Sequence, residues 1–96
     1  MFNSMINHNC PRLVKGARLF WDDVRQQKFL LFPEGALVLN NTSWDILQLC
    51  DGRHTVTDIV GILSAEYSHP NIEPDVLKLL NKITERGFLY YDPSSI

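Results

Sequence analysis

The sequence has few of the features that mark an enzyme or a metal-binding protein. Its 96 residues contain two cysteines, Cys10 and Cys50, and three histidines whose spacing does not bring two onto one predicted element. It contains no glycine-rich phosphate loop and no nucleophile motif. We therefore expect no enzymatic activity, no catalytic residues, no metal site and no bound cofactor.

The sequence also lacks a large excess of charge of one sign and has no long apolar run. Nine Lys and Arg residues against eleven Asp and Glu give a net charge of -2, which disfavours nucleic acid as a general partner. No apolar stretch approaches the roughly 20 residues needed to span a bilayer, and no signal peptide opens the chain. We expect a cytoplasmic protein with no membrane partner and no disulfide.

The composition that is present suits one globular domain. Hydrophobic residues make up 45% and charged residues 21% of the chain, as in ordinary folded proteins. Residues 1–10 and 92–96 are polar and show no periodicity, so we predict flexible tails there. The folded domain is predicted to span residues 11–91.

The first half of this domain predicts an antiparallel sheet. Short apolar runs occupy residues 18–22, 28–32 and 36–39, and a Pro33-Glu34-Gly35 turn separates the last two. Three such runs with short connections predict a meander whose third strand lies at an edge. This strand contains neither charge nor proline, the features that normally prevent an edge from pairing with another chain.

From residue 40 the apolar period changes to that of helices. Thr42 with Asp45, and Thr55 with Asp58, have the spacing of capping boxes at the starts of two helices. Pro74 marks the first turn of a third. Residues 88–91, which follow this third helix, are predicted to form a short closing strand or an extended segment. Three strands followed by three helices predict an α+β fold that resembles a winged helix-turn-helix.

The third predicted helix carries a basic stripe beside an apolar one. The cations recur at i, i+4 and i+8: Lys78, Lys82 and Arg86. The apolar residues beside them are Val76, Leu80 and Ile83, which we predict to form the apolar wall of a groove if a peptide pairs with the edge of the sheet. The stripe has three interpretations: a solvated face near the negative end of the helix dipole, a rim that attracts an acidic partner, or a DNA-reading surface.

The unprotected edge at Leu37, Val38 and Leu39 also has three interpretations. In the first, residues 88–91 cover the edge. In the second, a second copy of the chain pairs with it by strand exchange to give a homodimer. In the third, a foreign peptide adds to it as a fourth strand. Because side chains alternate along a strand, Leu37 and Leu39 face one side and Val38 faces the other. The sequence leaves open which side meets a peptide.

Three segments carry a resemblance to a known family. They are "CPRLVKGARLFWD", "LLFPEGALVLNNTSWDILQLCDGRHTVTDIVGIL" and "EPDVLKLLNKITERGFL", and the resemblance they carry spans roughly residues 11–89, nearly the whole domain. Their most specific parts are the Pro-Glu turn leading to Leu39-Asn40, the "ILQLCDG" segment and the Asp75-Val76 helix start. In these parts the sequence resembles the PqqD family of pyrroloquinoline quinone (PQQ) biosynthesis. Trp44 departs from the small residue expected beside the helix cap.

This resemblance implies a peptide chaperone of the class called RiPP recognition elements. Such a protein binds the precursor peptide PqqA beside its third strand. It presents the peptide to the radical SAM enzyme PqqE, which crosslinks a Glu and a Tyr of PqqA. The quinone is the product of the pathway, so no bound cofactor is implied. Two alternatives from other classes remain open: a DNA-binding winged helix protein and a self-associating structural protein.

Overall fold

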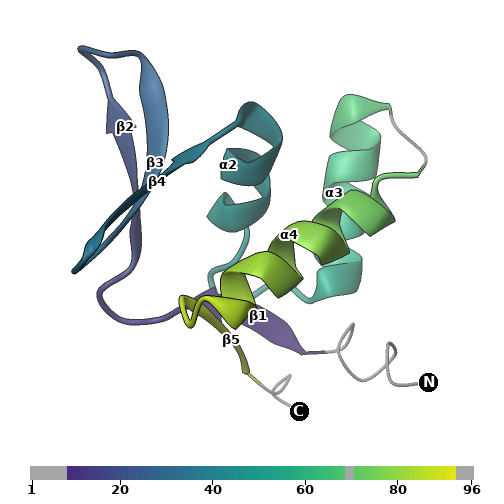
Figure 1. Cartoon of the computed structure of the whole chain (residues 1–96). Coiled ribbons are helices and arrows are strands. Elements are labelled where there is room, and N and C mark those ends of the chain that lie inside the picture. Colours follow the sequence, from purple (N-terminus) through teal and green to yellow (C-terminus); the bar gives the residue numbers. More distant parts are fainter. Residues whose placement is uncertain (1–8, 69–70, 93–96) are drawn as a thin grey trace.

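The computed structural model of the chain describes residues 9–68 and 71–92. The histidines at positions 8 and 69 lie outside the described residues, as do residues 1–8 and 93–96 of the predicted tails 1–10 and 92–96. The described residues form five strands and three helices, and Figure 1 shows how these elements are arranged. In chain order they are β1 (Cys10–Leu13), β2 (Arg18–Asp22), β3 (Gln27–Phe32), β4 (Gly35–Leu39), α2 (Asn41–Gln48), α3 (Val56–Tyr67), α4 (Glu73–Glu85) and β5 (Leu89–Asp92).

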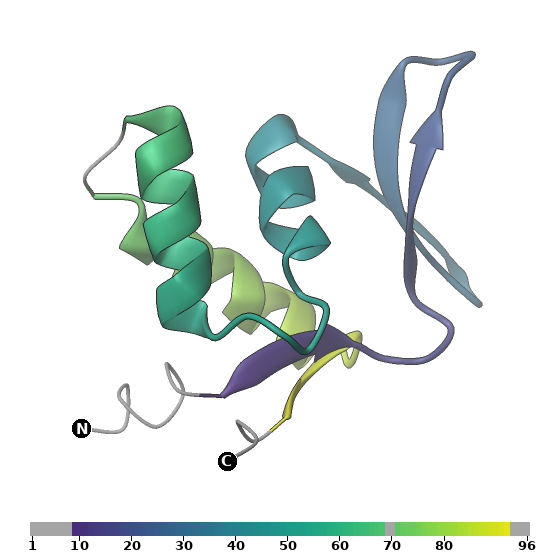
Figure 2. The same cartoon turned by 180° about the vertical axis from the view of Figure 1, so that it is seen from behind.

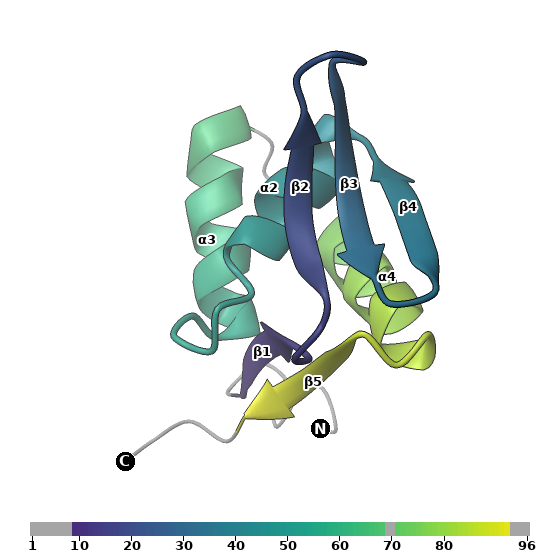
Figure 3. The same cartoon turned by 90° about the vertical axis from the view of Figure 1, so that its left-hand side faces the viewer.

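The larger sheet is the predicted antiparallel meander, with strand order β2-β3-β4. Phe32 pairs with Gly35 across a two-residue turn, so Pro33 and Glu34 form the tip of the β3–β4 hairpin. Within the described chain β4 pairs with β3 alone. Figure 3 shows β4 as an outer strand of the sheet. The prediction that the third strand of the meander is an edge is confirmed.

A second sheet, which the sequence did not reveal, joins the two ends of the domain. β1 pairs antiparallel with β5, with Cys10 opposite Asp92 and Leu13 opposite Leu89. The paired strands thus extend one residue beyond the predicted limits of 11 and 91 at each end, and Cys10 is buried rather than in a tail. Because β5 pairs with β1, the alternative in which residues 88–91 cover the edge of β4 is wrong.

The helix starts follow from capping side chains. The predicted capping box of Thr55 and Asp58 is confirmed at the start of α3, where each side chain accepts a hydrogen bond from the backbone of the other residue. The predicted cap at Thr42 is wrong. Asn40 caps α2, and its Oδ1 accepts a hydrogen bond of 2.7 Å from the backbone N–H of Ser43. Asparagine is as good an N-cap as threonine, and it comes first along the chain.

The end of α4 redirects the chain into β5. Gly87 has a φ of +82°, which a residue with a side chain rarely adopts. The N–H groups of Gly87 and Phe88 donate to the carbonyls of Thr84 and Ile83, at 2.9 and 3.1 Å, which is the pattern of a Schellman motif. The ring of Phe88 then stacks on Phe32, with centroids 4.3 Å apart, and ties the end of α4 to the β3–β4 hairpin.

The helices lie on one face of the larger sheet, and the core fills the space between them (Figures 1, 2 and 3). Leu30 contributes to the core from the centre of the sheet, and each helix contributes fully buried aliphatic residues. The buried helical residues are Ile46, Leu47, Val56, Ile59, Leu63, Val76, Leu80 and Ile83. None of the described helices combines the length and apolar character needed to cross a bilayer.

Candidate functional site

The backbone of β4 presents hydrogen-bonding groups at an open edge. In the turn that follows Phe32, the carbonyl of Phe32 faces the N–H of Gly35. Inward and outward backbone groups alternate along an antiparallel strand, so Gly35, Leu37 and Leu39 bond to β3. The N–H and C=O groups of Ala36 and Val38 therefore point away from the sheet. These two residues offer two donors and two acceptors to an incoming strand.

The register of β4 also determines which side chains face the helices. Leu39 is 8% exposed and Leu37 is partly buried against the core. Val38 lies on the opposite face of the sheet and is 66% exposed. A peptide added beside β4 therefore meets Leu37 and Leu39 on its helical side, whereas Val38 contributes mainly its backbone.

The three apolar residues of α4 that were predicted to form a wall lie in the core. Val76, Leu80 and Ile83 are at most 1% exposed. They sit at the centre of the apolar stripe of α4 and are enclosed by the sheet and the other helices. They have no surface to offer a peptide in this state. Leu79, on the flank of the same stripe, is partly buried and remains accessible.

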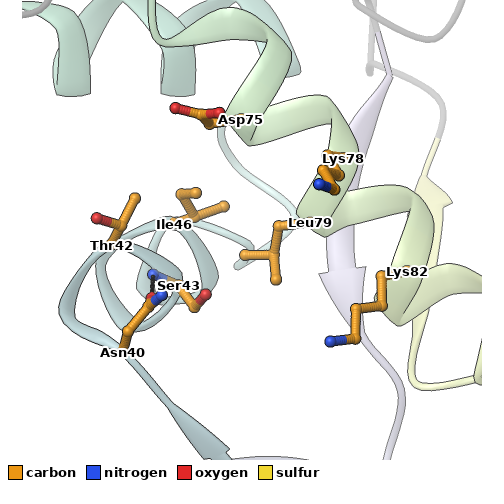
Figure 4. A pocket seen from close by; sticks show the side chains of 8 residues that line it. All are labelled: Asn40, Thr42, Ser43, Ile46, Asp75, Lys78, Leu79 and Lys82. Carbon is orange, nitrogen blue, oxygen red and sulfur yellow. Dashed lines mark hydrogen bonds between the residues drawn. The ribbon is translucent and has the colours of Figure 1, made fainter.

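A pocket of about 350 Å³ opens between the start of α2 and the middle of α4. Figure 4 shows Leu79 pointing from α4 toward α2, with Lys78 and Lys82 on the same helix. The eight residues that line the pocket are Asn40, Thr42, Ser43, Ile46, Asp75, Lys78, Leu79 and Lys82. Asn40 directly follows β4, so the pocket begins where the open edge strand ends.

The charge of this pocket is mainly positive. Lys78 and Lys82 are exposed, and neither takes part in an ion pair among the described residues. The first turn of α2 contains no acidic residue, so the positive end of its dipole adds to the lysines. Asp75 is the acidic member of the lining. Arg86, the third predicted cation, lies apart from the pocket, with its guanidinium 5.9 Å from the centre of the Phe88 ring.

Tyr67 holds the helix that forms one side of the pocket. Its hydroxyl, at the end of α3, donates a hydrogen bond to the carboxylate of Asp45 on α2. This hydrogen bond, together with burial, raises the pKa of Tyr67 to about 12. A hydrogen bond from Thr42, which lines the pocket, acts in the opposite direction. Tyr67 thus links α3 to the half of α2 that supplies Thr42 to the pocket.

Replacing Tyr67 with Phe is expected to lower the free energy of unfolding by about 1 kcal/mol, the net value of such a hydrogen bond. The folded-state pKa is raised, so this contribution is present below pH 10 and is lost as the pH rises through about 12. Urea unfolding of both proteins at pH 7 and pH 11 measures it. Tyr90→Phe, at an exposed tyrosine, is the matched control. If Tyr67→Phe and Tyr90→Phe lowered the free energy of unfolding equally, this role of Tyr67 would be contradicted.

Titratable groups away from the pocket serve the fold. Burial raises the pKa of the Cys50 thiol to about 12, with a smaller effect of Asp51, so this core cysteine is a poor nucleophile. Burial alone would raise the pKa of Asp51, but hydrogen bonds from Arg53 and His54 outweigh it and lower that pKa. Among the described residues, no group of three or more His, Cys, Asp or Glu side chains is arranged to hold a metal ion.

The outer face of the larger sheet is an apolar surface that the sequence reasoning missed. Phe20, Phe29 and Val38 form one cross-strand row on this face, and Phe20 is 40% exposed. Within the described chain no helix covers this face of the sheet (Figure 3). The sequence does contain a signal for this surface. In residues 18–21 and 28–32 apolar side chains occupy both faces of the strands and do not alternate with polar ones.

Comparison with known proteins identifies both the fold and the family. The solution structure of the PqqD truncation of *Methylobacterium extorquens* PqqCD, described as a RiPP recognition element, matches with a TM-score of 0.71 and 39% identity, over 83% of this chain and 87% of that one. The heterocyclase TruD contains a similar fold, with a TM-score of 0.64 over 86% of this chain and 11% of that one, at 21% identity.

Sequence relatives agree with this structural match. A protein of *Methylococcus capsulatus* named PqqA binding protein is 40% identical over 75% of this chain and 77% of its own length. A protein of *Rhodopseudomonas palustris* with the same name is 38% identical over 88% of this chain and 85% of its own length. The model of the family described as coenzyme PQQ synthesis protein D matches residues 27–89. The chain belongs to the PqqD family.

Proposed function

We propose that this chain binds the precursor peptide PqqA by strand addition along β4 and presents it to the radical SAM enzyme PqqE. The observation that carries the proposal is the open edge of β4, where Ala36 and Val38 direct unpaired backbone groups outward next to a cationic pocket. Relatives that share 38–40% of their sequence with this chain are named for PqqA binding, which supports the choice of peptide.

The energetics require side-chain contacts in addition to the strand. Four ladder hydrogen bonds at a net value of about 1 kcal/mol each contribute roughly 4 kcal/mol. Association costs at least about 4 kcal/mol in lost translational and rotational freedom. The backbone bonds alone therefore leave almost no affinity, and apolar or charged side chains of the peptide must supply the rest.

We assign these contacts to β4 and α4. The strand comes from Leu37, Val38 and Leu39, with Ala36 and Val38 directing the backbone donors and acceptors outward, and Lys78 and Lys82 form the electrostatic rim. Leu79 replaces the buried residues of α4 as the apolar wall. Val76, Leu80 and Ile83 hold α4 in position from the core, and Arg86 extends the positive charge beyond the pocket.

The role we propose is positional and not catalytic. A module that holds the peptide and also contacts the enzyme raises the local concentration of substrate at the active site. The bound strand would leave both ends of the peptide free to extend from the sheet. The residue that reacts then needs no contact with this protein.

Isothermal titration of the protein with synthetic PqqA, followed by addition of PqqE, tests this function. We expect a one-to-one complex with the peptide and a ternary complex that elutes together in size-exclusion chromatography. Absence of heat with PqqA would contradict the proposal. Steeply salt-dependent retention on duplex DNA would favour a nucleic-acid role instead. A molar mass that doubles with concentration would favour strand exchange between two copies of the chain.

A further inference from the structure

The ammonium group of Lys28 lies between the two tryptophans of the chain. Its Nζ is 6.0 Å from the centre of the Trp21 ring and 5.7 Å from that of Trp44. The same Nζ donates a hydrogen bond of 2.9 Å to Oδ1 of Asn41. These four residues, Trp21, Lys28, Asn41 and Trp44, form what we call the lysine cradle.

The cradle is built by the sheet register and by the start of α2. Trp21 on β2 pairs with Lys28 on β3, and Lys28 pairs with Leu39 on β4, so the three side chains form one row on the helical face. Asn41 and Trp44 belong to the first turn and a half of α2, which begins immediately beyond β4. A cation is therefore fixed at the end of the strand to which a peptide would add.

The cradle borders a second pocket, of about 320 Å³. The pocket extends from Gln26 and Gln27 at the β2–β3 turn to Val38 and Leu39 at the end of β4, and Lys28 forms part of its lining. Its lining comes from the β2–β3 hairpin, the end of β4 and Asn41, whereas the lining of the pocket with Lys78 and Lys82 comes from Asn40, α2 and α4. The two pockets are lined by different residues.

Lys28 has no acidic partner in the described part of the chain. An ammonium has three donors, and Asn41 accepts one of them through a neutral oxygen. The tryptophan rings attract the cation but do not neutralise its charge. Contact with two indole rings excludes water from part of the ammonium surface, which strengthens an interaction with an anion. The site is thus prepared for one negatively charged group.

We infer that this pocket is a subsite for a carboxylate of the bound peptide, with Lys28 as its specificity-determining residue. The inference rests on the proposed function, because it names the side-chain chemistry that the peptide must present beyond the end of β4. A single ammonium matches the single charge of an acidic side chain. Gln27 and Asn41, which also line the pocket, add neutral amide groups, whereas the amide of Gln26 donates to the backbone carbonyl of Asp23.

The variants Lys28→Met and Lys28→Arg test the subsite from the protein side. Methionine keeps an apolar stem between the indole rings and removes the charge, and we expect PqqA to bind about tenfold more weakly at low salt. Arginine keeps the charge, so most of the affinity is retained. Lys15→Met removes an exposed lysine that lines neither pocket and leaves the affinity unchanged.

Substitutions in the peptide test the same subsite without changing the protein fold. Each acidic residue of synthetic PqqA is replaced in turn by its amide, and a further peptide has an amidated C-terminus. One of these peptides should bind the wild-type protein about tenfold more weakly, and should bind Lys28→Met no more weakly than the unchanged peptide does. If the C-terminal amide is the peptide with this effect, the carboxylate is that of the chain end.

Tryptophan fluorescence provides a local readout, because both tryptophans of the sequence flank Lys28. Saturation with PqqA should change the emission of the wild-type protein, and the peptide without the critical carboxylate should change it less. Equal affinities of the wild-type protein and Lys28→Met, or no coupling with any peptide carboxylate, would overturn the subsite while leaving PqqA binding intact. Absence of binding to the wild-type protein would overturn the proposed function and the subsite together.

Discussion

Replacing Val38 with proline is expected to weaken PqqA binding by at least about tenfold while the domain stays folded. Proline removes one of the two N–H donors that β4 directs to its open edge, and an acceptor of the peptide loses its partner. The ring also occupies the space in which an added strand would lie. Because the lost N–H faces outward, the hydrogen bonds between β4 and β3 remain, as for prolines found in natural edge strands.

Two further variants separate the backbone effect from other causes. Val38→Ala shortens the exposed side chain but keeps the N–H, so its affinity for PqqA should remain within about twofold of wild type. Leu37→Pro removes an inward N–H and should disrupt the hairpin itself, which circular dichroism detects. Unchanged affinity of a folded Val38→Pro protein would exclude strand addition at β4.

Reversing the charges of Lys78 and Lys82 is expected to weaken PqqA binding by roughly tenfold or more at low salt. Both cations line the pocket at the end of β4 and lack ion-pair partners in the described structure, so glutamates there would repel an acidic peptide segment. The difference between wild type and the double variant should shrink as ionic strength rises, because salt screens exposed charges. Titrations at about 20 mM and about 500 mM salt, between which the Debye length shortens roughly fivefold, measure this difference.

The matched control reverses two cations that line neither pocket, with the same change in net charge. Lys15→Glu combined with Arg53→Glu meets this condition, since both side chains are exposed. If this control weakened binding as much as the Lys78 and Lys82 reversals, the effect would come from net charge alone. The stripe on α4 would then be an ordinary solvated face.

Most of the fold follows from local sequence signals. The Pro33-Glu34 turn and the run after it predicted the hairpin and its open edge, and Thr55 with Asp58 predicted the start of α3. β1 was missed because a strand of four residues that contains Pro11 has little local signal. Its formation depends on pairing with β5, which lies about 80 residues later in the chain, and such a distant partner cannot be read from periodicity.

The candidate site was harder to predict than the fold. Periodicity identified the apolar stripe of α4 but did not separate its buried centre, such as Leu80, from its accessible flank at Leu79. The lysine cradle depends on how α2 packs against the sheet, and no spacing in the sequence relates Lys28 to Trp44. Residues that meet only through tertiary packing were therefore the ones that the sequence did not reveal.

Titration of the isotope-labelled protein with synthetic PqqA, followed by amide NMR, is the most direct test of the account. Strand addition predicts large shifts at residues 36–40, with protection of the Val38 amide from exchange, and further shifts along α4 around Lys78, Leu79 and Lys82. Small or absent shifts in these segments at saturating peptide, or shifts confined to the outer face of the sheet, would contradict it.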